Sequence, residues 1–105
     1  MVNTLEEKKG EDILLLDIQS LTPIADYFII CTATSDRMLR ALAEGVEEKM
    51  AGQPTDWHRH EGRPEDGWMV LDYGSVIVHL LTNDLRRYYR LEELWGDGRV
   101  VLRLK

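Results

Sequence analysis

Short apolar blocks alternate with polar turns along the first third of the chain. Residues 13–16 and 27–31 are apolar runs of strand length, with Gly10 before the first and Pro23 after it. Runs this short, without a polar face, are typical of strands that are buried on both sides. We therefore expect a sheet with helices covering both of its faces.

A helical pattern follows the second of these runs. Thr34 or Ser35 can cap the helix, and Gly52, followed by Pro54, can end it. Between these limits apolar side chains recur at helical spacing and form one stripe, at Leu39, Leu42, Ala43, Val46 and Met50. The polar first ten residues predict a frayed end or a short opening helix.

The strongest hairpin signal spans residues 68–81. Two apolar segments flank Gly74-Ser75, and glycine at the first central position favours a two-residue type II′ turn. This turn sets the register and creates an almost wholly apolar face that should meet a helix, with the pairs Tyr73–Val76, Leu71–Val78 and Met69–Leu80. The other face is more mixed and should be less completely covered; it carries Trp68, Val70, Asp72, Ile77, His79 and Leu81.

The last quarter of the chain predicts one more helix and one more strand. Asn83 or Asp84 can cap a helix over residues 85–95, which two glycines then break. Residues 99–105 alternate apolar with charged side chains and predict an edge strand. The polar segment 53–67 is a connection with room for one short strand near Trp57.

Length and composition are those of one small domain, spanning residues 1–105. Hydrophobic residues make up 44% and charged residues 30% of the chain, both ordinary for a globular protein. No apolar run approaches the ~20 residues that cross a bilayer, and the start lacks the pattern of a signal peptide. We therefore expect a cytoplasmic protein. Cys31, its one cysteine, lies in an apolar run and should be a buried, reduced thiol.

The formal net charge of −6 argues against broad nucleic-acid binding, because an acidic chain repels phosphate backbones. Arg86, Arg87 and Arg90 form a local exception in the last predicted helix. One interpretation is a solvated helix face, balanced by Glu92 and Glu93. The other is contact with a carboxylate or a phosphate of a partner.

One pair of residues on the hairpin could carry acid–base chemistry. Asp72 and His79 share a face, where they could form a catalytic dyad or a structural hydrogen bond. No nucleophile or oxyanion donor is apparent beside them, which favours the structural interpretation. Gly74-Ser75 leads into no helix and no paired acids, so the chain lacks the magnesium-binding pattern of a nucleotidyltransferase.

A possible metal pair lies ahead of the hairpin. His58 and His60 alternate, as two ligands on one strand face would, and Glu61 follows them. A zinc site needs three or four ligands, and no obvious fourth is present. We expect no catalytic residue, no metal and no cofactor. A small metal-dependent hydrolase or nucleotidyltransferase that uses Asp72, His79 and this pair remains the alternative from another class.

Three segments of the chain, in order, resemble the signatures of one protein family. Residues 21–37 (LTPIADYFIICTATSDR) resemble the first. Residues 67–79 (GWMVLDYGSVIVH), with Glu61-Gly62 ahead of them, resemble the second, and residues 86–95 (RRYYRLEELW) the third. The family is the ribosomal silencing factors, also called Iojap-related, and the match runs over residues 9–95. The chain departs from the family's usual glycine, histidine and acidic residue at Ala33, Met38 and Ser75.

The resemblance implies a fold and a function. The fold is α/β, a mixed sheet flanked by helices and distantly similar to nucleotidyltransferases. The function is binding to the fourteenth protein of the large ribosomal subunit, on the inter-subunit face, which blocks joining of the small subunit and represses translation. Family members also act in large-subunit assembly, which stays an alternative. Ribosomal proteins are often basic, so an acidic chain would be steered toward one.

The second and third signatures name the residues that we expect to contact the partner: Trp68, Tyr73, Gly74, Arg86, Arg87, Tyr89, Leu91, Leu94 and Trp95. Core packing competes with this interpretation, most evenly for Tyr73, Tyr88 and Leu91. Trp68 and Trp95 stand at the ends of elements, which favours an interface. A local contact with ribosomal RNA and a homodimer, formed through exposed aromatic residues or the predicted last strand, both stay open.

Overall fold

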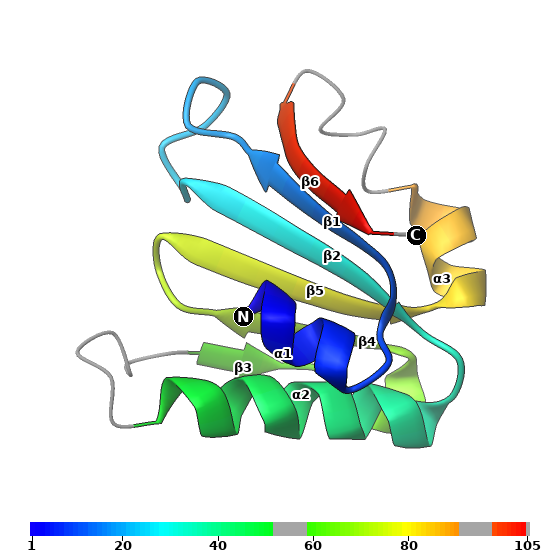
Figure 1. Ribbon diagram of the computed structural model, residues 1–105. Coiled ribbons are helices and arrows are strands. Elements are labelled where there is room, and N and C mark those ends of the chain that lie inside the picture. The colour runs from blue at the N-terminus through cyan, green and yellow to red at the C-terminus, as the bar shows by residue number, and fades with distance from the viewer. Residues whose placement is uncertain (52–58, 91–97, 105) are drawn as a thin grey trace.

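The structure, a computed structural model, describes residues 1–51, 59–90 and 98–104. Its centre is one mixed sheet in the order β3-β4-β5-β2-β1-β6 (Figure 1). β2 and β5 run parallel and every other neighbouring pair is antiparallel. The predicted α/β fold with a mixed sheet is therefore confirmed. The strands are β1 (Glu11–Asp17), β2 (Tyr27–Ala33), β3 (Arg59–Glu61), β4 (Trp68–Asp72), β5 (Val76–Thr82) and β6 (Arg99–Leu104).

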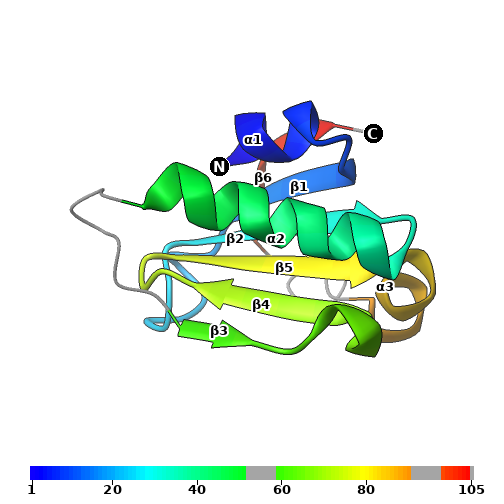
Figure 2. The same ribbon diagram turned by 90° about the horizontal axis from the view of Figure 1, so that it is seen from below.

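Helices α1 (Val2–Glu7) and α2 (Asp36–Met50) lie together on one face of the sheet. Helix α3 (Asn83–Tyr89) lies beyond the end of β5, and a short 3-10 turn, Pro64–Asp66, precedes β4 (Figure 2). Among the described helices only α3 reaches the other face, and only at one end, so the expectation of helices covering both faces is met in part. No helix in the described ranges is both long and apolar enough to span a membrane.

Helix α2 follows its sequence pattern closely. Ser35 is the N-cap, and its hydroxyl accepts a hydrogen bond from the backbone N–H of Met38 at 3.1 Å. Leu39, Leu42 and Val46 are fully buried against the sheet. The core of this face also includes Ile29, Cys31, Met69, Leu71, Tyr73, Val78 and Leu80.

The β4–β5 hairpin has the predicted register, with Leu71 opposite Val78 and Met69 opposite Leu80. Gly74 has φ of +84°, a backbone conformation that favours glycine, and Tyr73 N–H donates to the carbonyl of Val76 at 2.9 Å. The apolar face of the hairpin meets α2, as predicted. The other face is indeed less covered, because Trp68, Val70, Asp72 and His79 are only half-buried.

The second face of the sheet is closed at its two ends. Phe28, Ile30 and Ile77 form part of a separate apolar cluster there. At one end Ile18 and Ala25, from the β1–β2 connection, complete it; at the other, Trp68, Val70 and Leu85 pack against it. Helix α3 thus meets this face only at one end, through Leu85 and through Arg86, which bonds Thr32.

The C-terminal elements depart in part from their prediction. Helix α3 begins at Asn83 rather than at Leu85, with Thr82 as its N-cap, and ends at Tyr89 rather than at Trp95. Arg90 follows in a left-handed conformation with φ of +49°, which ends the helix. The predicted edge strand is confirmed as β6, which pairs with β1. The short strand predicted near Trp57 is β3, and Trp57 itself lies outside the described residues.

Candidate functional site

The end of the sheet where α3 lies is assembled by contacts between distant segments. Trp68, at the start of β4, pairs with Leu81 near the end of β5. The carbonyl of Gly67 accepts a hydrogen bond from Thr82 N–H at 2.9 Å. A Cβ atom at Gly67 would lie 3.0 Å from Leu85 Cδ1. Glycine at this position therefore lets the first turn of α3 approach the start of β4 closely.

Trp68 is held in place by a histidine on the neighbouring strand. Its Nε1–H donates to Nδ1 of His79 at 3.3 Å, and the ring of Phe28 meets His79 edge-on at 5.0 Å. Burial lowers the pKa of His79 to about 4, because desolvation penalises the charged imidazolium. The imidazole is therefore neutral near pH 7 and can accept the indole hydrogen bond.

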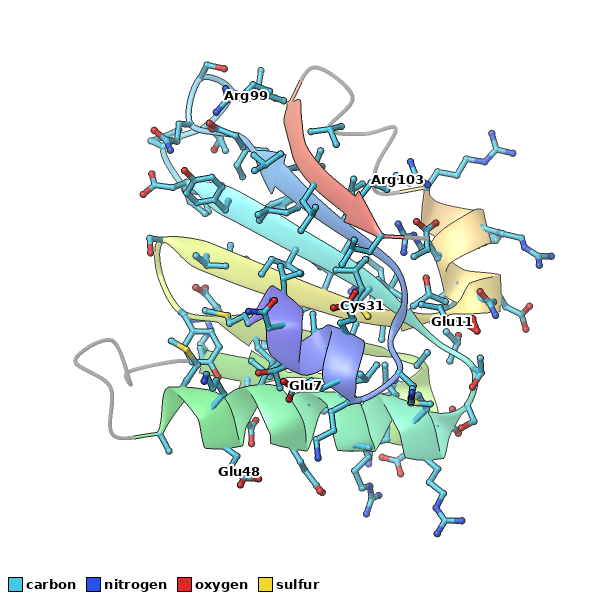
Figure 3. The ribbon with its side chains drawn as sticks, in the orientation of Figure 1. Glu7, Glu11, Cys31, Glu48, Arg99 and Arg103 are labelled. Atoms are coloured by element: carbon cyan, nitrogen blue, oxygen red, sulfur yellow. The ribbon has the colours of Figure 1, made fainter. Side chains whose placement is uncertain are left out.

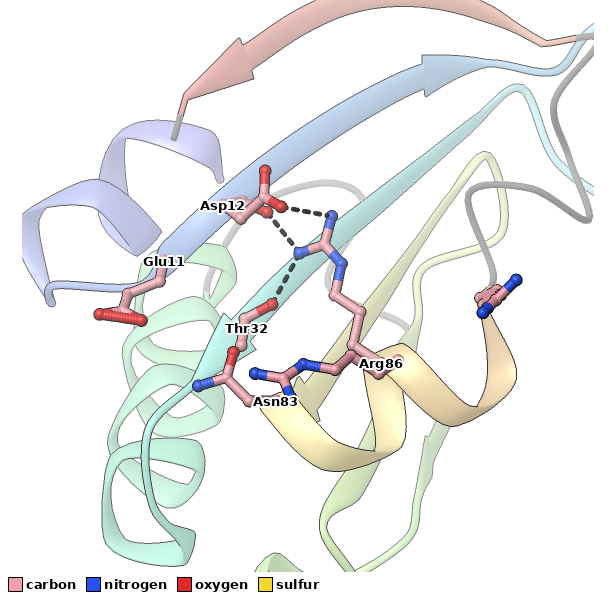
Figure 4. A pocket seen from close by; sticks show the side chains of 7 residues that line it. Glu11, Asp12, Thr32, Asn83 and Arg86 are labelled. Atoms are coloured by element: carbon pink, nitrogen blue, oxygen red, sulfur yellow. Dashed lines mark hydrogen bonds and ion pairs between the residues drawn. The ribbon is translucent and has the colours of Figure 1, made fainter.

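Arg86 joins α3 to the two central strands β1 and β2. Its guanidinium donates to the backbone carbonyl of Asp12 and, at 2.7 Å, to the hydroxyl of Thr32 (Figure 4). A carboxylate oxygen of Asp12 lies 3.6 Å from the same guanidinium. Only 5% of Arg86 is exposed. We had expected Arg86 on the contact surface, but its side chain lies inside the molecule and anchors the helix.

The strand end that receives Arg86 is irregular. The pairing of β1 with β2 shifts between Glu11 and Leu14, and Asp12 has φ of +42°. This bulge turns the Asp12 carbonyl toward Arg86, as bulges at strand ends often redirect a group. Arg103 of β6, labelled in Figure 3, holds the Asp12 carboxylate through two bonds of 3.1 Å. No local sequence pattern predicts this arrangement, because Arg86 and Asp12 are far apart along the chain.

An open pocket of about 500 Å³ lies between α3 and the ends of β1 and β2. Arg86 and Asp12 form part of its wall, and Arg87 and Arg90 add two exposed guanidinium groups. The complete lining is Glu11, Asp12, Thr32, Asn83, Arg86, Arg87 and Arg90. The three arginines predicted as one basic patch therefore share one pocket, although only two of them present their charge to solvent.

The remaining described residues of the predicted contact set do not lie on one surface. Tyr73 is 6% exposed and packs in the core beneath α2, so core packing is the correct interpretation of its side chain. Gly74 is exposed at the opposite end of β5 from α3. Seven strand residues separate the two ends, on the order of 23 Å at the usual rise per residue. Trp68 lies at the α3 end of the hairpin, and Gly74 lies at the opposite end, in the turn.

The third signature is described only in its first half. The backbone of Tyr89 closes α3, while its side chain, together with Leu91, Leu94 and Trp95, lies outside the described residues. Tyr88, which we had not placed in the contact set, is 78% exposed. So large an exposed aromatic ring beside Arg87 is unusual and marks this end of the molecule as a candidate contact surface. Helical spacing alone does not predict which of Tyr88 and Tyr89 is exposed.

The two groups proposed for chemistry are engaged in structural contacts. The Asp72 carboxylate accepts from the backbone N–H of Gly74 at 2.8 Å, whereas His79 accepts from Trp68, so the two residues do not bond each other. His60 Nδ1 lies 3.1 Å from Glu47 Oε1 of α2, and His58 lies outside the described residues. Among the residues that the structure describes, no three His, Cys, Asp or Glu side chains are grouped to hold a metal.

Cys31 is fully buried behind α1 (Figure 3), as predicted. Burial raises the pKa of its thiol to about 12, so the thiolate is scarce at neutral pH. A Cβ at Gly10 would come within 2.5 Å of its sulfur, which explains the glycine that precedes β1. Cys31 is thus a packing residue.

Together these features define a small α/β domain whose α3 end presents aromatic and basic side chains, the composition of a binding surface. The chain belongs to the ribosomal silencing factor family. The family model described as "ribosomal silencing factor during starvation" matches residues 1–104. The resemblance stated from the three signatures is therefore confirmed.

Individual relatives agree with this assignment. A ribosomal silencing factor from Bacillus subtilis is 39% identical over 93 residues, which cover 89% of this chain and 79% of the relative. A crystal structure of a Chromobacterium violaceum protein matches with a TM-score of 0.85 at 37% identity, covering 90% of this chain and 79% of that one. A mouse protein named mitochondrial assembly of ribosomal large subunit protein 1 is 29% identical over 98 residues, 90% of this chain and 43% of the mouse protein.

Proposed function

We propose that this protein is a ribosomal silencing factor that binds the large ribosomal subunit and prevents the small subunit from joining it. The observation that carries the proposal is the family match over residues 1–104. The partner is the fourteenth protein of the large subunit, on the inter-subunit face. The action takes place in the cytoplasm, where the two subunits meet.

The α3 end of the molecule is the surface that supports this contact. Tyr88 is exposed there, and Trp68 is half-buried at the edge of the apolar cluster that Leu85 completes. Tryptophan and tyrosine dominate binding hot spots, because each buries a large, rigid surface. The net charge of −6 favours approach to a basic ribosomal protein. Leu91, Leu94 and Trp95 stay in the proposed contact set.

Gly74 is not part of the proposed contact surface. It precedes β5, whereas Tyr88 lies in α3, which follows β5, so one compact patch does not include both. We assign the protein contact to the α3 end, and Gly74 to the geometry of the hairpin.

Silencing of this kind requires no turnover. A bound factor occupies surface that the small subunit needs, and the fraction of blocked subunits follows the factor's concentration relative to its dissociation constant. Asp72, His79 and His60 serve the fold in this account, as their contacts to Gly74, Trp68 and Glu47 support. No metal or cofactor has a part in it.

A role in assembly of the large subunit is the second candidate. It is favoured by the mouse relative, whose name describes assembly of the mitochondrial large subunit. Both roles use the same binding surface. Binding to mature large subunits would support silencing, and binding confined to immature particles would support assembly.

Co-sedimentation with purified large subunits tests the proposed surface. Tyr88→Ala should weaken binding about tenfold or more while leaving the fold intact, because it removes an exposed aromatic contact. Trp95→Ala should cost about 1–3 kcal/mol of binding free energy for the same reason. Glu48→Ala is the control: Glu48 is exposed on α2, toward the end of that helix that lies away from α3 (Figure 3). Equal binding by the Tyr88 variant and the control would rule out the α3 end.

A further inference from the structure

The pocket between α3 and the ends of β1 and β2 has a chemistry that the protein–protein contact does not use. Three arginines and two acids line it, and the side chains of Thr32 and Asn83 complete it. The chain as a whole carries a net charge of −6, so a positive pocket is a local reversal of the molecule's charge. A local reversal of this kind favours an anionic ligand at this one place.

One of the two acids of the pocket, Asp12, is bound by arginines of the protein itself, whereas Glu11 is exposed. The Asp12 carboxylate is shared between Arg86, at 3.6 Å, and Arg103, which holds it through two bonds of 3.1 Å. Two cations therefore compensate one carboxylate. The Arg86 side chain is 6% exposed and forms the buried base of the pocket. The exposed positive charge on the pocket wall on which the inference depends is that of Arg87.

Arg87 is the cation best placed to meet a ligand. Its side chain is exposed on the pocket wall, and it forms no ion pair with a carboxylate of the described residues. Asn83 lies one helical turn before Arg87, on the same side of α3, and Arg90 lies one turn after it. A guanidinium fork matches the oxygens of a phosphate, and an amide can both donate to and accept from a hydroxyl.

We propose that this pocket binds a backbone phosphate of ribosomal RNA next to the protein contact. This inference rests on the proposed function, which brings the α3 end to the large subunit. Tyr88 is 78% exposed and adjacent to Arg87, which provides an aromatic face for a neighbouring base. The Asn83 amide can contact a ribose 2′-hydroxyl. The pocket's openness suits a strand that passes across it, and the acidic remainder of the chain prevents binding to RNA in general.

The test is the salt dependence of binding to purified large subunits. Each phosphate contact contributes about 0.7–0.9 to the slope of log K against log salt, through released counterions. Arg87→Gln should weaken binding about threefold to tenfold at low salt and lower that slope by about one. Tyr88→Ala should weaken binding and leave the slope nearly unchanged. Arg40→Gln, also an exposed helical arginine, should change neither.

The source of the phosphate is tested by local cleavage. Because Cys31 is fully buried, an iron chelate on Asp84→Cys, exposed at the start of α3, should be the only label. Hydroxyl radicals from it should cut large-subunit RNA at one place, whereas the same label on Glu48→Cys of α2 should not. Addition of inorganic phosphate to the isolated protein, followed by NMR, tests the other source. Saturation by phosphate without RNA cleavage would overturn the RNA assignment.

The outcomes separate this inference from the proposed function. If the wild-type protein fails to bind large subunits, both are overturned. If it binds and Arg87→Gln keeps the wild-type affinity and slope, only the phosphate site is overturned. If the slope falls and the Asp84→Cys label cuts RNA while the Glu48→Cys label does not, the site is established.

Discussion

At the scale of single residues, several polar side chains that invite a catalytic interpretation prove to support neighbours. His79 accepts the indole hydrogen bond of Trp68, and the Asp72 carboxylate fixes the hairpin turn through Gly74 N–H. The Arg86 guanidinium donates hydrogen bonds to the Asp12 carbonyl and the Thr32 hydroxyl. In each case a buried or half-buried polar group is satisfied by a specific partner, which its burial requires.

His79 makes the stability of the protein depend on pH. Its pKa is about 4 in the folded protein and near 6.5 when unfolded, so the unfolded chain binds the proton first as pH falls. The stabilisation by neutral His79 is complete above about pH 6.5 and is lost as pH falls toward about 4. Between about pH 7 and pH 4.5 this loss amounts to about 2–3 kcal/mol.

Urea unfolding at the two pH values measures this effect. His79→Gln keeps an acceptor for Trp68 and removes the titrating group, so the variant should lose less stability on acidification than the wild type by that amount. Carboxyl groups titrate in both proteins and cancel in the comparison. Parallel pH profiles for the two would contradict the account, because they would show that folding does not lower the pKa of His79.

Substitutions at two glycines with similar backbone conformations can distinguish the cost of backbone strain from the cost of crowding. Gly67 and Gly74 have φ of +79° and +84°, but only Gly67 is crowded, since a Cβ there would meet Leu85 at 3.0 Å and Thr82 at 3.2 Å. Alanine at Gly74 should cost about 1–2 kcal/mol of unfolding free energy, from the left-handed backbone alone. Alanine at Gly67 should cost more and displace α3. Equal losses in thermal unfolding would contradict the packing argument.

At the scale of elements, patterns within one segment predicted more than contacts between segments could. The stripe and cap of α2, the register of β4 with β5 and the edge strand β6 all follow from local periodicity and turn chemistry. Helix α3 was placed two residues late, because it begins at Asn83, directly after β5, without the side-chain capping hydrogen bond that the prediction relied on. Its end at Tyr89 was missed, since the left-handed Arg90 carries no glycine signal.

The anchor of α3 illustrates what a sequence pattern leaves out. Three arginines in one helix look alike in the sequence, yet Arg86 is 5% exposed while Arg87 and Arg90 are exposed. The difference depends on the bulge at Asp12 and on Thr32, from strands distant in the chain. Tyr73 and Tyr88 were likewise separated only by the packing, into the core and onto the surface.

Adjacent arginines give a direct test of that anchor. Arg86→Ala should lower the free energy of unfolding by about 2–4 kcal/mol, because it leaves Thr32 and the Asp12 carbonyl without their donor. Arg87→Ala should change it by less than about 0.5 kcal/mol, as an exposed substitution usually does. Chemical denaturation of both variants makes the comparison. A stable Arg86 variant would mean that α3 is held by Leu85 and Gly67 alone.

At the scale of the whole molecule, one end of the sheet gathers the features of a partner surface. The start of β4, the end of β5 and helix α3 meet there, with exposed Tyr88 and the arginine pocket beside half-buried Trp68. Helices α1 and α2 cover one face of the sheet, and the start of α2 lies beside the start of α3. A rigid sheet thus carries its contact residues at one edge, where they can meet a large partner without any rearrangement of the core.

The measurement that tests the central claim most directly is subunit joining in the presence of this protein. Purified large subunits are incubated with increasing amounts of it, small subunits are added, and joined ribosomes are separated from free subunits by sedimentation. The account predicts that joined ribosomes fall as the protein saturates the large subunit, with which it co-sediments, and that Tyr88→Ala requires a higher concentration. Joining that proceeds unchanged on large subunits saturated with the protein would contradict silencing.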